Sequence, residues 1–478
     1  MRVWNAGWLA LIVAALGIAG CSFGGSANGS YAPMPAQRIS SGNSSPIKHV
    51  IVVIQENRTF DNLFATFPGA DGTTTGEAEA VPVSEQSQCP IDHKEKVNLT
   101  EGNLAVGDDF GHKYSDVQID YDNGNMDGFD VDPIPAGGGK IACLHSYQYV
   151  NPSQIAPYWD IAQQYVLADH MYQTQGSGSF TAHQDLIAGG TAIDSHESII
   201  DDPSGFPWGC DSPSTTTTSL FTTDGQYEPG KGPFPCFTQY ETLRDRLDAA
   251  KISWNYYTEK VVPPPNGDTA GIWNAFDAIS AVRHSAEWGK KVTFNDKLIF
   301  KDISAGHLPA VSWVTPDALN SDHPQELEGG KDVDYGPSWV ASIVNAIGKS
   351  KYWKSSAIVI LWDDYGGFYD HESPAFFDNR GGLGFRVPML IVSPYARETT
   401  SSQPGYISHT QYETASILKF IEVNWGLKPL QLPDTRATSI GDSFNFSQKP
   451  RSFSVIPSEH PQSFFLHQTP SGLPPDTE

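Results

Sequence analysis

Two polar pairs, far apart in the sequence, are the residues whose types and spacing could do chemistry. Glu56–Asn57 follows the apolar run Val50–Ile54, and Asp363–Asp364 follows the apolar run Ile358–Leu361. Such β-branched runs are typical of strands buried in a parallel sheet, and open α/β sheets bind ligands just past the carboxyl ends of their strands. Adjacent carboxylates repel one another unless a cation holds them together. We therefore predict a metal site, although either pair alone could be an ordinary solvated turn.

A nucleophile could come from the Gly/Ser-rich turn in the run QTQGSGSFTAHQDLIAGG. Ser179 lies there between a strand-like stretch and a helix that we expect through Thr181–Gly189. Backbone N–H groups and the helix dipole favour an anion at such a helix start. A serine at this position is also a common N-cap, and Thr181 is a rival nucleophile in the same turn. His183 follows on the expected helix.

Four further histidines lie in or beside loops that follow expected strands. They are His112 in DFGHKYSD, His323 in ALNSDHPQ, His371 at the end of WDDYGGFYDH, and His409 at the start of a late expected helix. Taken singly, each is typical of a surface or structural histidine. Together they could donate hydrogen bonds to phosphate oxygens or protonate a leaving group.

Helical and apolar strand-like segments alternate along the chain, which predicts an α/β fold with a mostly parallel central sheet flanked by helices. Expected helices lie over 156–170, within 239–258, over 336–349 and over His409–Leu427, besides the one after Ser179. Further strands are expected at Val166–Leu167, 310–316 and Arg386–Pro394. The Gly-, Asp- and Pro-rich segment 68–150 predicts long loop insertions.

The beginning of the chain has the pattern of an exported lipoprotein. Residues 1–21 combine Arg2, an apolar stretch and a lipobox that ends at Cys21, the expected lipidation site. This stretch is short for a membrane span and typical of a signal peptide. Residues 22–46 predict a flexible tether, 47–442 a catalytic domain, and 443–478 an irregular Pro/Ser-rich tail. The alternative is ordinary cleavage to a freely secreted protein.

Cysteine content and charge fit an exported protein. Besides Cys21 the chain has Cys89, Cys143, Cys210 and Cys236, an even number that suits an oxidising compartment. Pairing nearest neighbours gives 89 with 143 and 210 with 236, but the sequence permits three pairings. The formal net charge of −25 argues against nucleic acid as a partner, because no basic stripe offsets phosphate repulsion.

Several separate motifs closely resemble the bacterial phosphoesterase family, which contains phosphatidylcholine-type phospholipases C and metal-dependent acid phosphatases. The family belongs to the alkaline-phosphatase-like superfamily. The resemblance covers roughly residues 47–435 and rests on five runs in the same order: HVIVVIQENRTFDNLF, GSFTAHQDLIAG, SDHP, SKYWKSSAIVILWDDYGGFYDH and GYISHTQYETASILKFIE.

The resemblance implies a role for each matched residue. Glu56, Asn57, Asp363 and Asp364 would bind the metal, Ser179 would be the nucleophile and reach the metal, His112 and His323 would contact phosphate, His183 would be a further catalytic residue, and His371 and His409 would be additional candidates. One divalent ion is implied, and calcium, manganese, magnesium and zinc all suit oxygen ligands with one amide. The chain departs from the family's GPSxP pattern, because Gly178 precedes Ser179 and Thr181 takes the later Pro position.

These residues favour hydrolysis of phosphate esters through a phosphoserine, with an acid-phosphatase-like monoesterase as the first expectation. A phospholipase C acting on phosphatidylcholine-type diesters is the alternative, so the expected partners are a small phosphate ester or phospholipid and, through the anchor, a membrane. A non-catalytic metal-binding surface lipoprotein is a third hypothesis of another class. A formylglycine sulfatase is disfavoured, since the residues after Ser179 lack the required Pro and Arg. The expected location is the periplasm or the cell surface.

Overall fold

The computed structural model describes residues 45–105, 107–135, 138–259, 271–324, 335–375, 378–399 and 405–472. The expected signal peptide with Cys21 and nearly all of the expected tether lie outside these residues. Within the described ranges, no helix combines the length and the apolar character that crossing a membrane requires.

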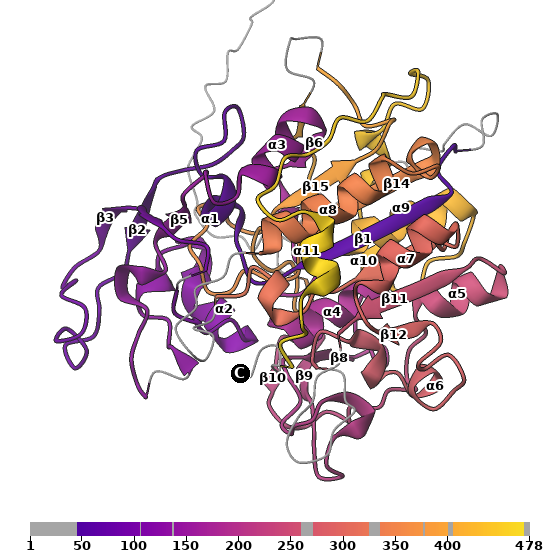
Figure 1. The fold of residues 1–478 in the computed structure, drawn as a ribbon. Helices are drawn as coiled ribbons and strands as arrows, with labels where there is room; N and C mark the ends of the chain where they lie inside the picture. The colour runs from indigo at the N-terminus through magenta and orange to yellow at the C-terminus, as the bar shows by residue number, and fades with distance from the viewer. Residues whose placement is uncertain are drawn as a thin grey trace, which may run out of the picture. The chain divides into compact units, whose positions relative to one another are not determined.

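An eight-stranded sheet forms the centre of the fold, with strand order β12-β11-β13-β1-β14-β15-β6-β16. The strands are β12 (Val292–Phe294), β11 (Trp254–Thr258), β13 (Val311–Val314), β1 (His49–Gln55), β14 (Ser356–Trp362), β15 (Met389–Val392), β6 (Val166–Ala168) and β16 (Tyr406–Ser408). Strand β15 is antiparallel to both of its neighbours, and the other neighbouring pairs are parallel. The expected α/β class with a mostly parallel sheet is confirmed (Figure 1).

Helices cover both faces of this sheet. The helices among the described residues are α1 (Phe60–Phe64), α2 (Tyr114–Tyr121), α3 (Ala156–Gln164), α4 (Ser179–Ala188), α5 (Leu243–Ala249), α6 (Ser280–Arg283), α7 (Leu298–Ala305), α8 (Gly336–Gly348), α9 (Ala415–Trp425), α10 (Leu432–Arg436) and α11 (Gln462–His467), of which α2 lies in the loop insertions rather than on the sheet. Helix α8 packs on α3, α7 and α11, while α9 packs on α4 and α10. Every residue of β14 is buried, and so is every residue of β1 after His49, as expected for strands that are covered on both sides.

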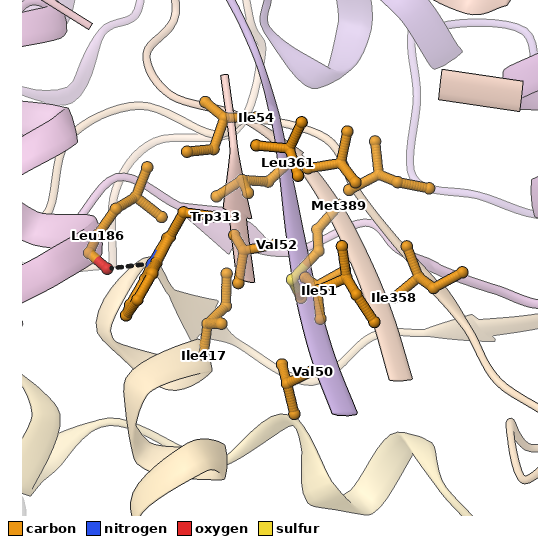
Figure 2. Packing of buried hydrophobic residues seen from close by; sticks show 14 of the residues in the cluster. Val50, Ile51, Val52, Ile54, Leu186, Trp313, Ile358, Leu361, Met389 and Ile417 are labelled. Carbon is orange, nitrogen blue, oxygen red and sulfur yellow. Dashed lines mark hydrogen bonds between the residues drawn. The ribbon is translucent and has the colours of Figure 1, made fainter. Parts of the chain in front are cut away.

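The core fixes helix α4 against the sheet. Trp313 of β13 is fully buried, and its indole N–H donates a hydrogen bond of 3.1 Å to the carbonyl oxygen of Leu186 in α4 (Figure 2). Val52 of β1 and Ile417 of α9 belong to the same cluster. Because interiors of this kind are close-packed, helix α4 as a whole has little freedom to move relative to β1.

Smaller sheets and two disulfides organise the loop insertions. The additional strands are β2 (Thr75–Ala78) with β3 (Glu95–Asn98), β4 (Thr100–Gly102) with β5 (Gln148–Val150), β8 (Glu197–Ile200) with β9 (Ser219–Thr222) and β10 (Tyr227–Glu228), and β7 (Met171–Tyr172) with β17 (Tyr412–Glu413). Cys89 pairs with Cys143, and Cys210 pairs with Cys236. The nearest-neighbour pairing is therefore confirmed.

Two segments differ from the sequence-based expectation. The helix expected to start at His409 starts at Ala415, because Tyr412–Glu413 pairs in parallel with Met171–Tyr172 and holds the preceding residues extended. The tail after residue 442 was expected to be irregular, but its described part contains α11 and contributes to the core. Phe465 of α11 is fully buried against the Trp339 ring of α8, at a centroid distance of 5.3 Å.

A buried acid on α9 gives the first testable prediction. Burial and the neighbouring Asp434 raise the pKa of Glu422 to about 9. Its unfolded pKa is near 4.5, so the folded state retains a proton that the unfolded state releases, and stability falls as pH rises between these values. Since Gln mimics the protonated acid, Glu422→Gln should raise the free energy of unfolding at pH 8 by about 3 kcal/mol and much less at pH 5. Urea unfolding at both pH values measures this.

Candidate active site

The pairing of β1 with β14 brings the two polar pairs together. In this parallel ladder Gln55 faces Trp362, the last residue of β14. The backbone bonding continues past the strand ends: the N–H of Asp363 donates to the Gln55 carbonyl at 3.0 Å, and the N–H of Arg58 donates to the Asp364 carbonyl at 3.0 Å. Both pairs therefore lie side by side at the carboxyl end of the sheet.

The two polar pairs are held in a tight turn. The backbone N–H of Asn57 donates to Asp363 Oδ1 at 3.1 Å. Asn57 adopts a φ of 56°, a left-handed conformation that Asn tolerates better than most residues. Gly366 is needed opposite it, because a Cβ there would lie 2.6 Å from the Asn57 carbonyl oxygen. Asn57 and Asp363 are at most 1% exposed, so both are removed from bulk solvent.

Ser179 is the first residue of helix α4 and reaches the carboxylates. Its Oγ donates a hydrogen bond of 3.1 Å to Asp364 Oδ2. The rival Thr181 is equally buried, and its Oγ1 makes no hydrogen bond within the described part of the chain. Ser177, in the same turn, instead donates to Asp201 at 2.7 Å. The structure thus brings Ser179, and neither of its neighbours, into hydrogen-bond contact with the acid pair.

His183, one helical turn after Ser179, completes a group that could hold a metal. Its Nε2 lies 3.2 Å from Glu56 Oε1 and 3.5 Å from Asp363 Oδ2, and all three side chains are buried. The buried Oδ1 of Asn57 has no hydrogen-bond partner among the described residues. Carboxylate and amide oxygens with one imidazole suit a divalent cation, so the residues present fit the metal that the sequence predicts.

His112 lies beside the same cluster in one defined tautomer. Its Nδ1 donates to the carbonyl oxygen of Phe110 at 2.8 Å, because a carbonyl can only accept. In the neutral ring Nε2 is then an acceptor, and Asn57 Nδ2 donates to it at 3.2 Å. This assignment turns Asn57 Oδ1 away from His112, as metal binding by that oxygen requires. His112 Nε2 is also 3.8 Å from Asp364 Oδ2.

His323 follows Asp322, which is bonded to β1, but the His323 side chain makes no hydrogen bond with the other candidate residues among the described contacts. Its ring nitrogens have no hydrogen-bond partner in the described ranges, and the ring lies 6.0 Å from that of Trp273. The preceding Asp322 is fixed to β1, since its backbone N–H donates to Gln55 Oε1 at 2.9 Å. His323 is therefore at the strand end, as expected, and its contact with phosphate stays a prediction.

His371 and His409 lie away from this site, each against another buried carboxylate. His371 Nδ1 lies 2.6 Å from Asp61 Oδ2, and His409 Nδ1 lies 2.8 Å from Asp169 Oδ2. Burial of the His371 ring disfavours its charge, but the hydrogen bond to Asp61 and the charge of Asp370 outweigh this and raise the pKa of His371 to about 9. Neither ring makes an observed contact with the four predicted metal ligands.

Sequence reasoning missed Arg58, which supports the site by bonding the backbone of two neighbouring segments. Its guanidinium is buried and donates to the carbonyl oxygens of Asp322 and Leu104, at 2.9 and 2.7 Å. It also lies over the Phe368 ring, 4.6 Å from the centroid. Burial lowers the pKa of Arg58 to about 10, although Asp322 opposes the shift. The available signal was its position directly after Asn57.

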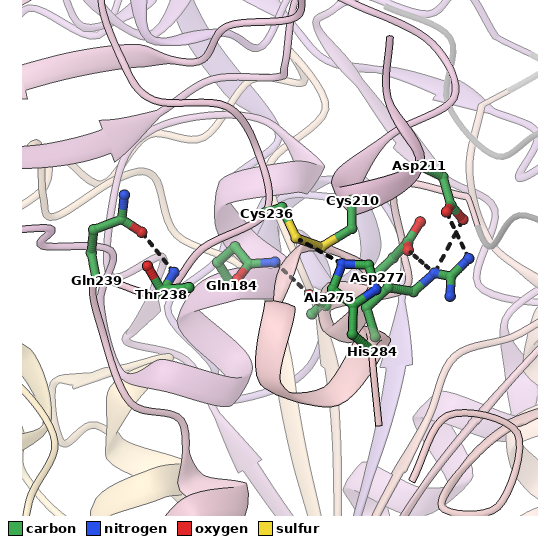
Figure 3. Close-up of a disulfide and its surroundings, with 10 residues drawn as sticks. Gln184, Cys210, Asp211, Cys236, Thr238, Gln239, Ala275, Asp277 and His284 are labelled. Carbon is green, nitrogen blue, oxygen red and sulfur yellow. Dashed lines mark hydrogen bonds and ion pairs between the residues drawn. A yellow bond between two sulfur atoms is a disulfide. The ribbon is translucent and has the colours of Figure 1, made fainter. Parts of the chain in front are cut away.

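The second disulfide supports α4 from the other side. Cys210–Cys236 adjoins the 3-10 helix Ala275–Ala278, and the Gln184 side-chain amide donates to the Ala275 carbonyl at 2.8 Å (Figure 3). Gln184 immediately follows His183, so this contact holds the helix turn that carries the imidazole. The disulfide, the 3-10 helix and α4 form one packed unit beneath the candidate site.

The chain belongs to the Phosphoesterase family, whose profile matches residues 47–428. It is 24% identical over 458 residues to non-hemolytic phospholipase C of Pseudomonas aeruginosa, with 87% of this chain and 59% of that protein covered. It is 25% identical to phospholipase C A of Mycobacterium tuberculosis (86% of this chain, 79% of that protein) and 23% identical to non-specific phospholipase C6 of Arabidopsis thaliana (78% and 67%). The chain thus spans less than two thirds of the Pseudomonas relative.

One solved structure with a similar arrangement is a protein in the alkaline phosphatase superfamily from Vibrio parahaemolyticus. It is 11% identical, its TM-score is 0.34, and the match covers 80% of this chain and 67% of that one.

Loss of the carboxylates should remove bound metal. We expect the double variant Glu56→Gln, Asp363→Asn to hold one divalent ion per chain fewer than the wild type after dialysis, because two of its oxygen ligands lose their charge. Metal at a hundredfold excess over its dissociation constant stabilises a protein by about 2.7 kcal/mol, so the variant should also melt lower in added metal.

Elemental analysis and thermal melting measure the metal content and the stability of the variant. Asp92→Asn is the control, since this carboxylate is 73% exposed and pairs only with the neighbouring His93 among the described contacts. Unchanged metal content in the double variant would contradict the assignment of Glu56 and Asp363 as ligands.

Proposed function

We propose that this protein hydrolyses phosphate esters through a phosphoserine formed at Ser179. The observation that carries the proposal is the 3.1 Å hydrogen bond from Ser179 Oγ to Asp364 Oδ2, next to the buried Glu56, Asp363 and His183. A hydroxyl at the first residue of a ten-residue helix faces backbone N–H groups that favour an anionic substrate. Membership of the Phosphoesterase family supports the same reaction class.

A single divalent ion held by Glu56, Asn57, Asp363 and Asp364 would neutralise phosphate charge and lower the pKa of the nucleophilic hydroxyl. Calcium, manganese, magnesium and zinc all suit these oxygen ligands. The residues of this chain do the rest.

In the first step Ser179 Oγ attacks phosphorus as the ester P–O bond breaks, and its proton leaves toward Asp364, which already accepts it. The α4 N–H groups stabilise charge on the phosphoryl oxygens. His112, once its Nε2 takes up a proton and gives up the hydrogen bond from Asn57 Nδ2, donates to an oxygen or protonates the leaving alkoxide, while its Nδ1 stays on the Phe110 carbonyl. Water then cleaves the phosphoserine.

A phospholipid diester is the substrate class that the relatives favour, because three of them are named phospholipases C. A small phosphate monoester is the alternative, in keeping with an acid-phosphatase-like enzyme. Both substrates use the same nucleophile and charge neutralisation. They differ in whether the phosphoryl group carries a second ester.

We further propose that the protein is exported and membrane-anchored through Cys21. Two disulfides support an oxidising compartment, since such bonds are rare in reducing cytosol. Mass analysis of the mature N-terminus from the native host tests the anchor, and an unmodified Cys21 would contradict it.

Hydrolysis of p-nitrophenylphosphorylcholine beside p-nitrophenyl phosphate tests the activity. We expect chelator-sensitive turnover, faster for the choline diester if the enzyme is a phospholipase C and faster for the monoester if it is a phosphatase. No turnover of either ester by metal-loaded protein would contradict the proposed reaction and favour a metal-binding surface protein.

Ser179→Ala identifies the nucleophile. This variant should lose about three orders of magnitude or more in kcat, because no side-chain oxygen replaces Oγ. Thr181→Val is the matched control from the same helix turn and should keep kcat within about tenfold. The opposite pattern would assign the nucleophile to Thr181, and mass analysis of rapidly quenched protein would show which residue carries the phosphoryl group.

A further inference from the structure

A second group of imidazoles and carboxylates lies outside the candidate active site, at the surface. We call Asp71, His170, His371 and Glu372 the His371 cluster. Asp71 follows α1, His170 follows β6, and His371 and Glu372 are in the loop after β14. The four side chains are 24–41% exposed, so an ion could reach them from solvent.

Each ring of the cluster is oriented by a fully buried carboxylate. His371 Nδ1 lies 2.6 Å from Asp61 Oδ2, and His170 Nδ1 lies 2.8 Å from Asp169 Oδ1. Because a carboxylate can only accept, both rings carry hydrogen on Nδ1; at His371 the 2.6 Å contact with Asp61 prevails over the longer 3.3 Å approach of Arg386 Nη2. A histidine that donates Nδ1–H to a carboxylate and turns Nε2 outward has the arrangement found around protein-bound zinc.

The two Nε2 atoms face the exposed carboxylates. His170 Nε2 is 3.4 Å from Asp71 Oδ2, while His371 Nε2 is 3.6 Å from Asp71 Oδ1 and 3.6 Å from Glu372 Oε1. Ligand atoms bound to one zinc at 2.0–2.1 Å in a tetrahedron are about 3.3 Å apart. The nitrogen–oxygen separations need to shorten by only a few tenths of an ångström.

The charge around the cluster also favours a cation. Five carboxylates converge there, those of Asp61, Asp71, Asp169, Asp370 and Glu372. Among the described contacts of these groups the permanent cation is Arg386, which is buried and bonds Asp370 at 3.0 Å. When the imidazoles are neutral, the net charge of these groups is strongly negative. Protonated histidines would offset this negative charge by forming ordinary ion pairs. A divalent cation would offset it instead by displacing the protons from the ring nitrogens.

We propose that His371 Nε2, Asp71 and Glu372 bind a zinc-type divalent cation, while His170 Nε2 orients Asp71 from its other carboxylate oxygen. The ion would connect the segment after α1 to the loop that carries Asp363 and Asp364. It would therefore cross-link the two stretches of chain that form the candidate active site, without contacting substrate.

The proposal is tested in the background Glu56→Gln, Asp363→Asn, which disables the candidate active-site metal. Zinc is titrated calorimetrically into this protein, and bound zinc is counted after dialysis. We expect one zinc per chain in the background and at least tenfold weaker binding after adding Glu372→Gln. Binding should be lost after adding Asp71→Asn with His371→Gln.

The matched control adds Asp108→Asn with His145→Gln to the same background. This exposed pair has the same Nδ1–carboxylate bond, 2.8 Å long, but has no second carboxylate recorded at Nε2. It should leave zinc binding unchanged. Circular dichroism and melting without metal establish that each variant is folded.

Absence of zinc binding in the background, or binding that persists in the folded Asp71→Asn, His371→Gln variant, would overturn the proposal. Neither outcome bears on phosphate-ester hydrolysis, which is measured on protein with an intact Glu56 and Asp363. Conversely, an inactive wild type with two bound ions would reject the proposed activity and leave the second site standing.

Discussion

The register between β1 and β14 is the constraint on which the candidate site depends. These two central strands are far apart in the sequence, at His49–Gln55 and Ser356–Trp362, and their ladder ends with Gln55 opposite Trp362. A slip of one residue would turn every side chain of a strand to the other face. Because both strands are buried on both sides, such a slip would also disrupt the core. The packing that stabilises the sheet thus aligns Glu56–Asn57 with Asp363–Asp364.

Buried charge is the second constraint, and the surrounding loops are built to tolerate it. A carboxylate removed from water is costly unless it is paired or hydrogen-bonded. Asp363 accepts a backbone N–H from Asn57, and Asp364 accepts one from Gly366 at 2.9 Å. These bonds orient the oxygens before any cation arrives. The site is preorganised by the backbone, and His183 and Ser179 approach it on a helix whose every residue is buried.

Much of the fold could be predicted from the sequence because buried strands and amphipathic helices leave strong local patterns. The juxtaposition of Glu56 with Asp363 followed from their equivalent places after apolar strands. The contacts of His183 and the separation of His371 from the site could not be predicted, since helix orientation and loop path depend on packing between distant segments. The late start of α9 was missed for a similar reason: the partner of Tyr412–Glu413 lies in β7, far away in sequence.

Arg386 illustrates how tightly the regions around the site are coupled. Its guanidinium donates to the carboxylates of Asp370 and Asp61 and to the carbonyl oxygens of Asp71 and Asp169. A lysine has neither the planar fork nor enough donors to serve four acceptors at once. A sequence change in any one of these segments is therefore tolerated only if the other segments still satisfy Arg386. Along an evolutionary path, the loop after α1, the turn after β6 and the loop after β14 should change together or hardly at all.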